Sequence, residues 1–301
     1  MYYFDYAATT PVAPEAAEAM VHALTRAFGN PSAQYPLGRE ARDAVAAQRA
    51  VIAQALGCDA GALYFTSCGT ESDNWAIRAA LHIGRHTGRH IITTAVEHSA
   101  VLEPCKALTQ EGYEVTYLQP DHAGRITADQ VEAALREDTA LVSIMAVNNE
   151  TGNVYPIAEI ARQLKARKSR ALLHTDAVQA FLKVPLHAQE DGADLISLSA
   201  HKIGGPKGVG ALYIAPALQS KMIPLLRGGG QEQGLRSGTE ATAQIAGFAK
   251  AVAQRADQLE EILAHTRAMR DYALERLLSI PTVQVLGTPD APHILCLTLP
   301  G

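Results

Sequence analysis

The stretch at positions 194–210, which reads DLISLSAHKIGGPKGVG, decides the fold. Its apolar first part is typical of a buried strand ending at Ser199, and a small, polar, cationic cluster ending at Lys202 precedes a glycine-rich loop. Ligands of α/β proteins bind where the strands end. A lysine placed there, partly desolvated and beside another cationic group, can lose its proton and attack an aldehyde. Lys202 is therefore a candidate Schiff-base residue; the alternative is an ordinary surface lysine in a glycine loop.

Short apolar runs alternate with helical patterns from about residue 60 to residue 215. This alternation predicts an α/β fold whose large domain has a mostly parallel, mixed sheet flanked by helices. A capping box at residues 127–130 opens one of the helices, and Pro156 occupies an early position in another. The predicted strands are residues 62–65, 90–94, 114–118, 140–147, 171–174, 195–199 and 210–214.

The composition changes toward the end of the chain. An alanine-rich helical pattern runs from about residue 239 to residue 278, with a break or bend, and two short strands are predicted at 283–286 and 294–299. We expect a large domain over residues 14–248 and a small α+β domain from residues 1–13 and 249–301. The small domain is expected to be incomplete, because the two closing strands need more cover than the remaining chain supplies.

Charge and composition exclude several classes of function. The net charge of -5 and the pI of about 6.1 give no basic excess, so we expect neither nucleic acid nor an anionic membrane as a partner. The N-terminus lacks the pattern of a secretion signal, and no apolar run reaches about 18 residues, so a cytoplasmic location is expected. The cysteines lack CxxC spacing, which suggests neither a zinc site nor a disulfide framework. They are Cys58, Cys68, Cys105 and Cys296.

An acid follows a second apolar strand, about one βα unit before the lysine. Asp176 ends the run at residues 171–176, which should lie beside the strand that leads to Lys202. A carboxylate that faces the pyridine nitrogen of pyridoxal 5′-phosphate (PLP) keeps that nitrogen protonated, so the ring can accept electrons. Asp176 is the candidate for this role. The alternative is an ordinary helix N-cap.

A phosphate group also needs a binding site. Residues 65–72 offer a strand, a small-residue turn through Gly69 and Thr70, and a helix start, whose backbone N–H groups and dipole favour an anion. Ser199 and His201 from the lysine strand would join them. A lysine, an acid and a phosphate turn in one βα series are much less expected by chance than any one of them.

Two further polar residues follow strands in the same series. His98 could stack its imidazole on the cofactor ring and move protons, although a satisfied histidine at a helix start is an equal alternative. Asn149 could hydrogen-bond the ring hydroxyl or a substrate carboxylate, and the alternative is a turn without a ligand.

Taken together, these segments resemble the NifS/IscS family of cysteine desulfurases, which belongs to fold type I of the PLP enzymes, in the class V aminotransferase group. Each segment is weak alone, but many separated matches in one order make the resemblance specific. The matching segments are residues 3–11, 29–32, 66–74, 97–98, 147–152, 176–179, 199–210 and 227–239.

The resemblance implies roles for the selected residues. Lys202 would form the Schiff base, Asp176 would face the pyridine nitrogen and His98 would stack on the ring, which makes these three the catalytic residues. Gln179 and Asn149 would contact the ring-hydroxyl side, with Asn149 also near the substrate carboxylate. The residues implied to hold the phosphate are Thr70, Ser199 and His201, next to Gly69.

The resemblance also implies the reaction and the partners. L-Cysteine would be converted to L-alanine, and its sulfur would pass to an enzyme cysteine as a persulfide and then to an acceptor such as an iron–sulfur scaffold protein or a thiolation pathway. In such enzymes a threonine matching Thr239 is lent by the partner subunit, so a homodimer is implied.

The sequence departs from the family pattern in one respect. The family's catalytic cysteine lies on a loop after the strand that residues 294–299 match, and none of the four cysteines corresponds to it. Of these four, only Cys68 is expected near PLP, in a turn rather than a catalytic role. Either the sequence is part of a longer desulfurase, which we favour, or it is a shortened relative that binds PLP without completing sulfur transfer. Selenocysteine lyase, another class V lyase and a non-catalytic PLP-binding scaffold are the alternative functions.

Overall fold

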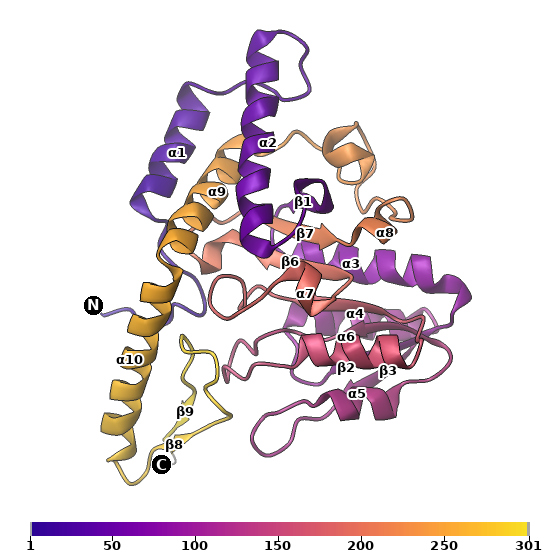
Figure 1. The fold of residues 1–301 in the computed structure, drawn as a ribbon, viewed down its shortest axis with the longest axis vertical. Coiled ribbons are helices and arrows are strands. Elements are labelled where there is room, and N and C mark those ends of the chain that lie inside the picture. Colours follow the sequence, from indigo (N-terminus) through magenta and orange to yellow (C-terminus); the bar gives the residue numbers. More distant parts are fainter. Residues whose placement is uncertain (1, 300–301) are drawn as a thin grey trace.

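The computed structural model describes residues 2–299 and has a seven-stranded sheet at its centre (Figure 1). The strands are β1 (Leu63–Thr66), β2 (His90–Thr94), β3 (Glu114–Leu118), β4 (Thr139–Ser143), β5 (Leu172–Asp176), β6 (Leu195–Ser199) and β7 (Gly210–Ile214). Their order is β1-β7-β6-β5-β4-β2-β3, and β7 runs antiparallel to both of its neighbours while the other pairs are parallel. The mostly parallel mixed sheet predicted from the sequence is confirmed.

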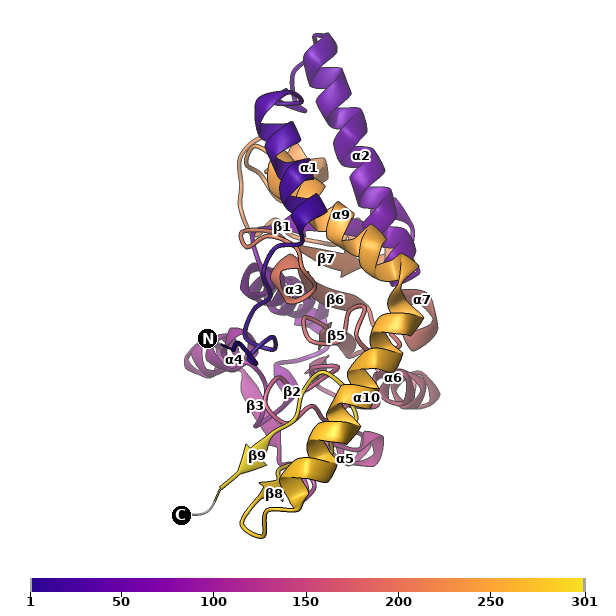
Figure 2. The same cartoon turned by 90° about the vertical axis from the view of Figure 1, so that its left-hand side faces the viewer.

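Helices cover both faces of the sheet because successive strand residues point to opposite sides. On β2, Ile91 packs in an apolar cluster with Trp75 and Val101, whereas the next residue, Ile92, packs in a second cluster with Ile160. The first cluster belongs to α3 (Gly69–Ile83) and α4 (Ser99–Gln110), and the second to α5 (Ala128–Ala134) and α6 (Ile157–Ala166). Figure 2 shows α4 and α6 on opposite sides of the sheet.

A second group of helices lies beyond the β1 side of the sheet. It is formed by α1 (Pro14–Thr25), α2 (Pro36–Leu56) and α9 (Thr242–Asp257), and α9 packs against both of the others (Figure 1). The short helix α7 (Ala188–Asp191) lies on the connection from β5 to β6, and α8 (Pro216–Gln219) follows β7 on the way to α9. Among the helices of residues 2–299, none combines the length and apolar character that a membrane crossing requires.

The end of the chain forms an arm beside the sheet. The predicted break in the long helix is found at Gln258, between α9 and α10 (Leu259–Leu278). None of the side chains of α10 is buried. The strands β8 (Gln284–Val285) and β9 (Leu297–Thr298) then pair antiparallel near the tip of α10 (Figures 1 and 2).

Several predicted boundaries require correction. The strand predicted at 140–147 ends at Ser143, and the chain then leaves the regular ladder, although Ala146 N still donates to Asp176 O at 2.8 Å. The strand predicted at 171–174 extends to Asp176, where it still pairs with β6. The two closing strands are shorter than predicted because they pair only with each other.

The predicted domain boundary at residue 248 falls inside α9, whose residues Phe248 and Val252 are both buried in the same core. The change in packing comes later, at Gln258, where the buried helix α9 gives way to the exposed helix α10. The division into two domains stays a prediction, and its outermost residues, 1 and 300–301, lie outside the described part of the chain.

A buried ion pair ties the loop before α9 to the sheet. Both carboxylate oxygens of Glu232 accept hydrogen bonds from Arg49, at 2.6 and 2.7 Å, and Oε2 also accepts one from Phe65 N at 2.8 Å. The Glu232 side chain is 3% exposed. Each of these donors helps to hold the buried acid in place. If the loop moved away, Arg49 and Phe65 N would lose their hydrogen-bond acceptor.

We expect Glu232→Gln to lower the free energy of unfolding by about 2 kcal/mol, because one half of the charge pair is lost and an amide N–H then faces Arg49. Urea denaturation of the cofactor-free protein measures this effect. Glu111→Gln is the matched control, since the Arg78–Glu111 pair has the same two-pronged geometry but both partners are more than 40% exposed. Equal losses in the two variants would contradict the assignment.

Candidate active site

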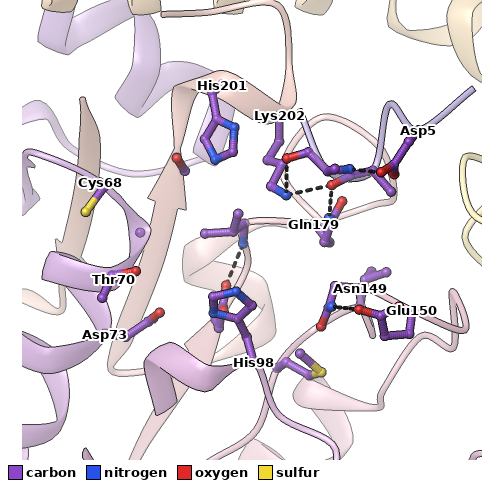
Figure 3. Close-up of a pocket in the computed structure, with 18 residues that line it drawn as sticks. Asp5, Cys68, Thr70, Asp73, His98, Asn149, Glu150, Gln179, His201 and Lys202 are labelled. Atoms are coloured by element: carbon purple, nitrogen blue, oxygen red, sulfur yellow. Dashed lines mark hydrogen bonds between the residues drawn. The ribbon is translucent and has the colours of Figure 1, made fainter. Parts of the chain in front are cut away.

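A pocket of about 460 Å³ opens where several strands of the sheet end (Figure 3). Its walls come from the ends of β5 and β6, the first turn of α3, the start of α4, the loop after β4 and the N-terminal segment. Nine of the ten residues predicted to bind the cofactor line it. They are Gly69, Thr70, His98, Asn149, Asp176, Gln179, Ser199, His201 and Lys202.

Lys202 reaches this pocket from a single 3-10 turn, Ala200–Lys202, that follows β6. Its Nζ donates hydrogen bonds to Ala7 O at 2.6 Å and Ala8 O at 2.9 Å. Burial lowers the pKa of Lys202, and the nearby carboxylates, Asp176 first among them, only partly oppose this. A lowered pKa increases the share of neutral, nucleophilic amine at a given pH. Lys202 is therefore a half-buried residue of the pocket wall and not an exposed lysine of the glycine loop.

The N-terminal segment is fastened to the lysine turn by its own hydrogen bonds. Thr10 donates to His201 O through both its N–H, at 3.0 Å, and its hydroxyl, at 2.9 Å. Gly204 N donates in turn to the Thr10 hydroxyl at 2.8 Å. These bonds bring Ala7 and Ala8 into the pocket wall although nearly two hundred residues separate them from Lys202.

Asp176 ends β5, which pairs in parallel with β6, so its carboxylate and Lys202 belong to neighbouring strand ends. The residue is 6% exposed, and its Oδ1 accepts a hydrogen bond from Val178 N at 2.9 Å. Burial, reinforced by the nearby Asp73, raises the pKa of Asp176 to about 7. The local backbone bond is of the capping type that the alternative anticipated, yet the same carboxylate also lines the pocket.

The turn between β1 and α3 provides room for an anion. Gly69 opens α3, and a Cβ built on it would lie 2.7 Å from Val178 Cγ2, so any larger residue would have to displace the Val178 side chain. Opposite, the buried hydroxyl of Ser199 has no hydrogen-bond partner among the described residues. A buried hydroxyl without a partner, beside backbone N–H groups at a helix start, is suited to a phosphate oxygen.

Two histidines lie on opposite sides of the pocket. Figure 3 shows the ring of His98 across from His201 and Lys202. Nδ1 of His98 accepts a hydrogen bond from Ala100 N at 3.1 Å, which leaves Nε2 to carry the proton of the neutral ring. Burial, with help from nearby lysines, lowers the pKa of His201 to about 4, so this ring is neutral and acts through hydrogen bonds.

Two predicted residues already have partners within the chain, and one lies elsewhere. Asn149 donates to the carboxylate of Glu150 at 2.7 Å, and Gln179 donates to Ala7 O at 2.8 Å. Thr239 is exposed and does not line the pocket. Of the four cysteines, all within the described residues, only Cys68 lines the pocket.

Sequence reasoning missed a second buried acid in the pocket wall. Asp73 is 1% exposed, and its Oδ1 has no hydrogen-bond partner among residues 2–299. Burial raises the pKa of Asp73 to about 7. Its spacing within α3 could have revealed it, because Asp73 lies three and seven residues before Ala76 and Ala80 on the inward face. The other lining residues that sequence reasoning assigned no role are Asp5, Ala7, Ala8, Met145, Val147, Glu150 and Val178.

Glu97 forms a third buried acid behind the pocket. Its carboxylate accepts hydrogen bonds from the Thr94 hydroxyl at 2.9 Å and from Met145 N at 3.0 Å. Burial raises the pKa of Glu97 to about 8, and the charges of Asp176 and Asp73 add to the effect. These three acids cannot all be ionised cheaply in one low-dielectric region, so the floor of the pocket is ready to receive positive charge.

The comparisons with known proteins agree on the family of this chain. The family model for class V aminotransferases matches residues 2–301. A cysteine desulfurase IscS from Methanosarcina thermophila is 45% identical over 287 residues, which cover 95% of this chain and 70% of that relative. A solved NifS-like protein superposes with a TM-score of 0.94 at 36% identity, covering 99% of this chain and 81% of the other. A structure titled SspA in complex with cysteine gives 0.88 at 36% identity, covering 100% and 84%.

The fold, the pocket and the family match define a PLP-dependent enzyme of the class V aminotransferase family. Within this family, the chain belongs to the cysteine desulfurases of the NifS/IscS type. The resemblance, the fold class and the cofactor predicted from the sequence are thereby confirmed.

Glu97 should make stability depend on pH. Between the ordinary value of 4.5 and about 8, the folded protein keeps a proton on Glu97 that the unfolded chain has lost, so the free energy of unfolding falls as pH rises through this window. We expect Glu97→Gln to flatten this fall, by up to about 1.4 kcal/mol per pH unit. Urea titrations of the cofactor-free protein across this range measure it. Glu103→Gln on the exposed side of α4 is the control, and parallel curves for wild type and Glu97→Gln would contradict the prediction.

Proposed function

We propose that this protein catalyses the conversion of L-cysteine to L-alanine with PLP as its cofactor. The single observation that carries the proposal is the convergence of Lys202 and Asp176, from neighbouring parallel strands, on one pocket that also contains the Gly69 turn. Relatives named cysteine desulfurases at 45% identity support the substrate.

The residues present fit PLP. The amine of Lys202, with its lowered pKa, suits covalent attachment to an aldehyde. The unpartnered Ser199 hydroxyl and the start of α3 suit a phosphate, and the buried Asp176 suits a cationic ring nitrogen. A charge of that sign would return the pKa of Asp176 toward its ordinary value, because an opposite charge favours the carboxylate.

When bound, PLP supplies an aldehyde that condenses with amines and a ring that withdraws electrons from the substrate α-carbon. The chain's own residues would then divide the remaining work. Lys202 would anchor the cofactor and exchange protons at the α-carbon, and Asp176 would hold the proton on the ring nitrogen. His98 lines the pocket and uses Nδ1 to accept a hydrogen bond, which leaves Nε2 free. This residue would stack on the ring and move a proton.

The rest of the pocket would bind and orient. We assign the phosphate to Gly69, Thr70, Ser199 and His201. Asn149 and Gln179, which line the pocket beside Lys202, would contact the ring-hydroxyl side of the cofactor, with Asn149 close to the substrate carboxylate. Asn149 would have to release Glu150 to do so, and amide rotation achieves this at the cost of one surface hydrogen bond.

Sulfur removal needs a thiol as acceptor. The balanced step is cysteine plus a thiol giving alanine plus a persulfide: the carbon–sulfur bond breaks, a sulfur–sulfur bond forms, and a proton returns to the carbon. Burial raises the pKa of both Cys58 and Cys105 to about 12, which makes them poor nucleophiles. We therefore propose that the sulfur leaves to a thiol other than these two, and finally to an acceptor protein such as an iron–sulfur scaffold.

We further propose that two chains form a homodimer in which Thr239 contributes to the phosphate site of the partner subunit. Thr239 is exposed, and the loop before it is anchored at Arg236, which pairs with Glu71 in the first turn of α3 at 2.8 Å. The end of this loop therefore lies beside the first turn of α3, and Thr239 is exposed there. A cytoplasmic location stays a prediction.

Lys202→Ala tests the cofactor site directly. We expect loss of the visible absorbance of the bound cofactor, no cofactor trapped on the chain by borohydride, and no alanine from cysteine in the presence of added dithiothreitol, because the attacking amine is gone. The control is Lys207→Ala, five residues along the same loop and exposed. A wild-type protein that neither absorbs nor forms alanine, or a Lys202→Ala variant that behaves like Lys207→Ala, would refute the proposal.

Asp176→Asn separates cofactor binding from chemistry. The variant should still trap the cofactor on Lys202, but alanine formation should fall by about a hundredfold or more, because the ring nitrogen loses the carboxylate that keeps it protonated. Asp194→Asn is the matched control: it is a partly buried acid before β6 that accepts a hydrogen bond from Leu173 N at 2.8 Å and does not line the pocket. Normal turnover by Asp176→Asn would exclude the assigned role.

A further inference from the structure

A buried lysine lies behind the active-site pocket and takes no part in the mechanism described so far. Lys183 is 3% exposed, and its Nζ donates a hydrogen bond of 2.8 Å to Oε1 of Gln179. Gln179 is four residues earlier on the turn after β5, the spacing at which side chains on one helical face meet. Lys183 itself does not line the pocket, whereas Gln179 does.

The surroundings of Lys183 make its burial costly. The groups close enough to influence it are cationic or neutral: Arg255 from α9, Lys202 from the turn after β6, and His293 from the C-terminal arm. Both ring nitrogens of His293 lack a partner among the described residues, and burial lowers the pKa of His293 to about 2. Burial and the two neighbouring cations lower the pKa of Lys183 well below its ordinary value. An apolar side chain of similar length would fold here at lower cost.

The backbone is also bent to place this lysine. Leu182, directly before it, has a φ of 55°, a left-handed conformation that a leucine adopts only when its surroundings require it. Arg255 Nε holds that conformation by donating to Leu182 O at 2.8 Å. A strained backbone and a buried amine at adjacent positions indicate that the contact they create has a use.

We propose that Lys183 is a positioning residue that fixes the side-chain amide of Gln179 so that its N–H donors, and not its oxygen, face the active-site pocket. The amine donates and occupies the amide oxygen, so the amide nitrogen must point the other way. One of its two protons goes to Ala7 O at 2.8 Å (Figure 3). In this proposal the second proton is left for the pocket. Without Lys183, only the bond to Ala7 O would oppose rotation of the amide by half a turn, a rotation that would present an acceptor instead.

This inference rests on the proposed function, because it takes the occupant of the pocket to be PLP. A fixed donor at this wall stabilises negative charge on an oxygen of the cofactor. It therefore affects the cofactor's affinity and the pH at which its visible absorbance changes, and both can be measured without turnover.

The experiment is a double-mutant cycle with Lys183→Met and Gln179→Leu, in which PLP is titrated into cofactor-free protein and absorbance is recorded against pH. Lys183→Met should weaken PLP binding by about three- to tenfold, the value of one net hydrogen bond. It should also raise the pH midpoint of the visible absorbance change, since the deprotonated form of the bound cofactor loses a hydrogen-bond donor. In the Gln179→Leu background, Lys183→Met should change neither quantity further. Additive effects would overturn the proposal.

Arg255→Met distinguishes positioning from a general loss of positive charge. Arg255 is a neighbouring buried cation, but it contacts Leu182 and not Gln179. In the Gln179→Leu background, we expect neither Arg255→Met nor Lys183→Met to change the pH midpoint of the visible absorbance. A shift that both variants produce in that background would assign the effect to charge and overturn the proposal.

A stability measurement tests the contact without any cofactor and does not depend on the single Lys183→Met variant folding. Gln179→Leu leaves the Lys183 amine without its acceptor, so adding Lys183→Met to it should raise the urea midpoint. A urea midpoint that is lower in the double variant than in Gln179→Leu alone would overturn the proposal. Failure of wild type to bind PLP would overturn both proposals, whereas wild-type binding with an unchanged Lys183→Met spectrum would overturn only this one.

Discussion

The parallel pairing of β5 with β6 is the constraint on which the active site depends. Its register places Asp176 opposite Ser197, so the chain that leaves β6 has two more strand residues and one tight turn before Lys202. A slip of β5 by one residue would turn the Asp176 carboxylate to the opposite face of the sheet and away from the pocket. The antiparallel strand β7 locks this register from the other side, since Ser199 pairs with Gly210, whose missing side chain lets the backbone of Cys68 approach. Acid, amine and phosphate turn are thus fixed by one set of ladder bonds.

Burial then gives these groups their chemistry. Asp73, Glu97 and Asp176 are acids whose pKa values are raised, and Lys183, His201 and Lys202 are bases whose pKa values are lowered. Both shifts have the same first cause, the loss of water, and both reduce the number of charged groups in and around the pocket. The protein therefore holds groups that are close to neutral but easily ionised. A cofactor with a cationic ring and an anionic phosphate completes the charges that burial has suppressed, and much of its binding energy can come from that exchange.

The sequence predicted the parts of the site that local patterns encode. Lys202, Asp176 and Gly69 each follow a short apolar strand, and strand ends share one edge of a parallel sheet, so their convergence follows from βα alternation alone. The sequence could not reveal what tertiary contacts decide. Ala7 and Ala8 have no distinctive chemistry, and they enter the site because Thr10 binds the lysine turn. Asp73 belongs to the second turn of α3, and an acid near the start of a helix is usually exposed, so its residue type gives no sign of burial. The strand predicted at 140–147 ends at Ser143, and farther on Val147 forms an antiparallel bridge with Val154, a pairing that the sequence pattern does not show.

The N-terminal segment forms part of the pocket wall, and most of the hydrogen bonds that hold it do not involve Lys202. Ala7 O accepts hydrogen bonds from both Lys202 and Gln179, at 2.6 and 2.8 Å. The proposed attachment of an aldehyde to Lys202 would remove most of this hydrogen bonding, since the amine would then have fewer protons to donate. The segment nevertheless stays in place, because the bonds from Thr10 to His201 O and from Ala13 N to Gly204 O involve no group that reacts. Gln179 also keeps its bond to Ala7, provided that its amide cannot rotate. The wall of the pocket is thus held by bonds that do not involve Lys202, so the wall would keep its form if Lys202 acted as the proposed nucleophile.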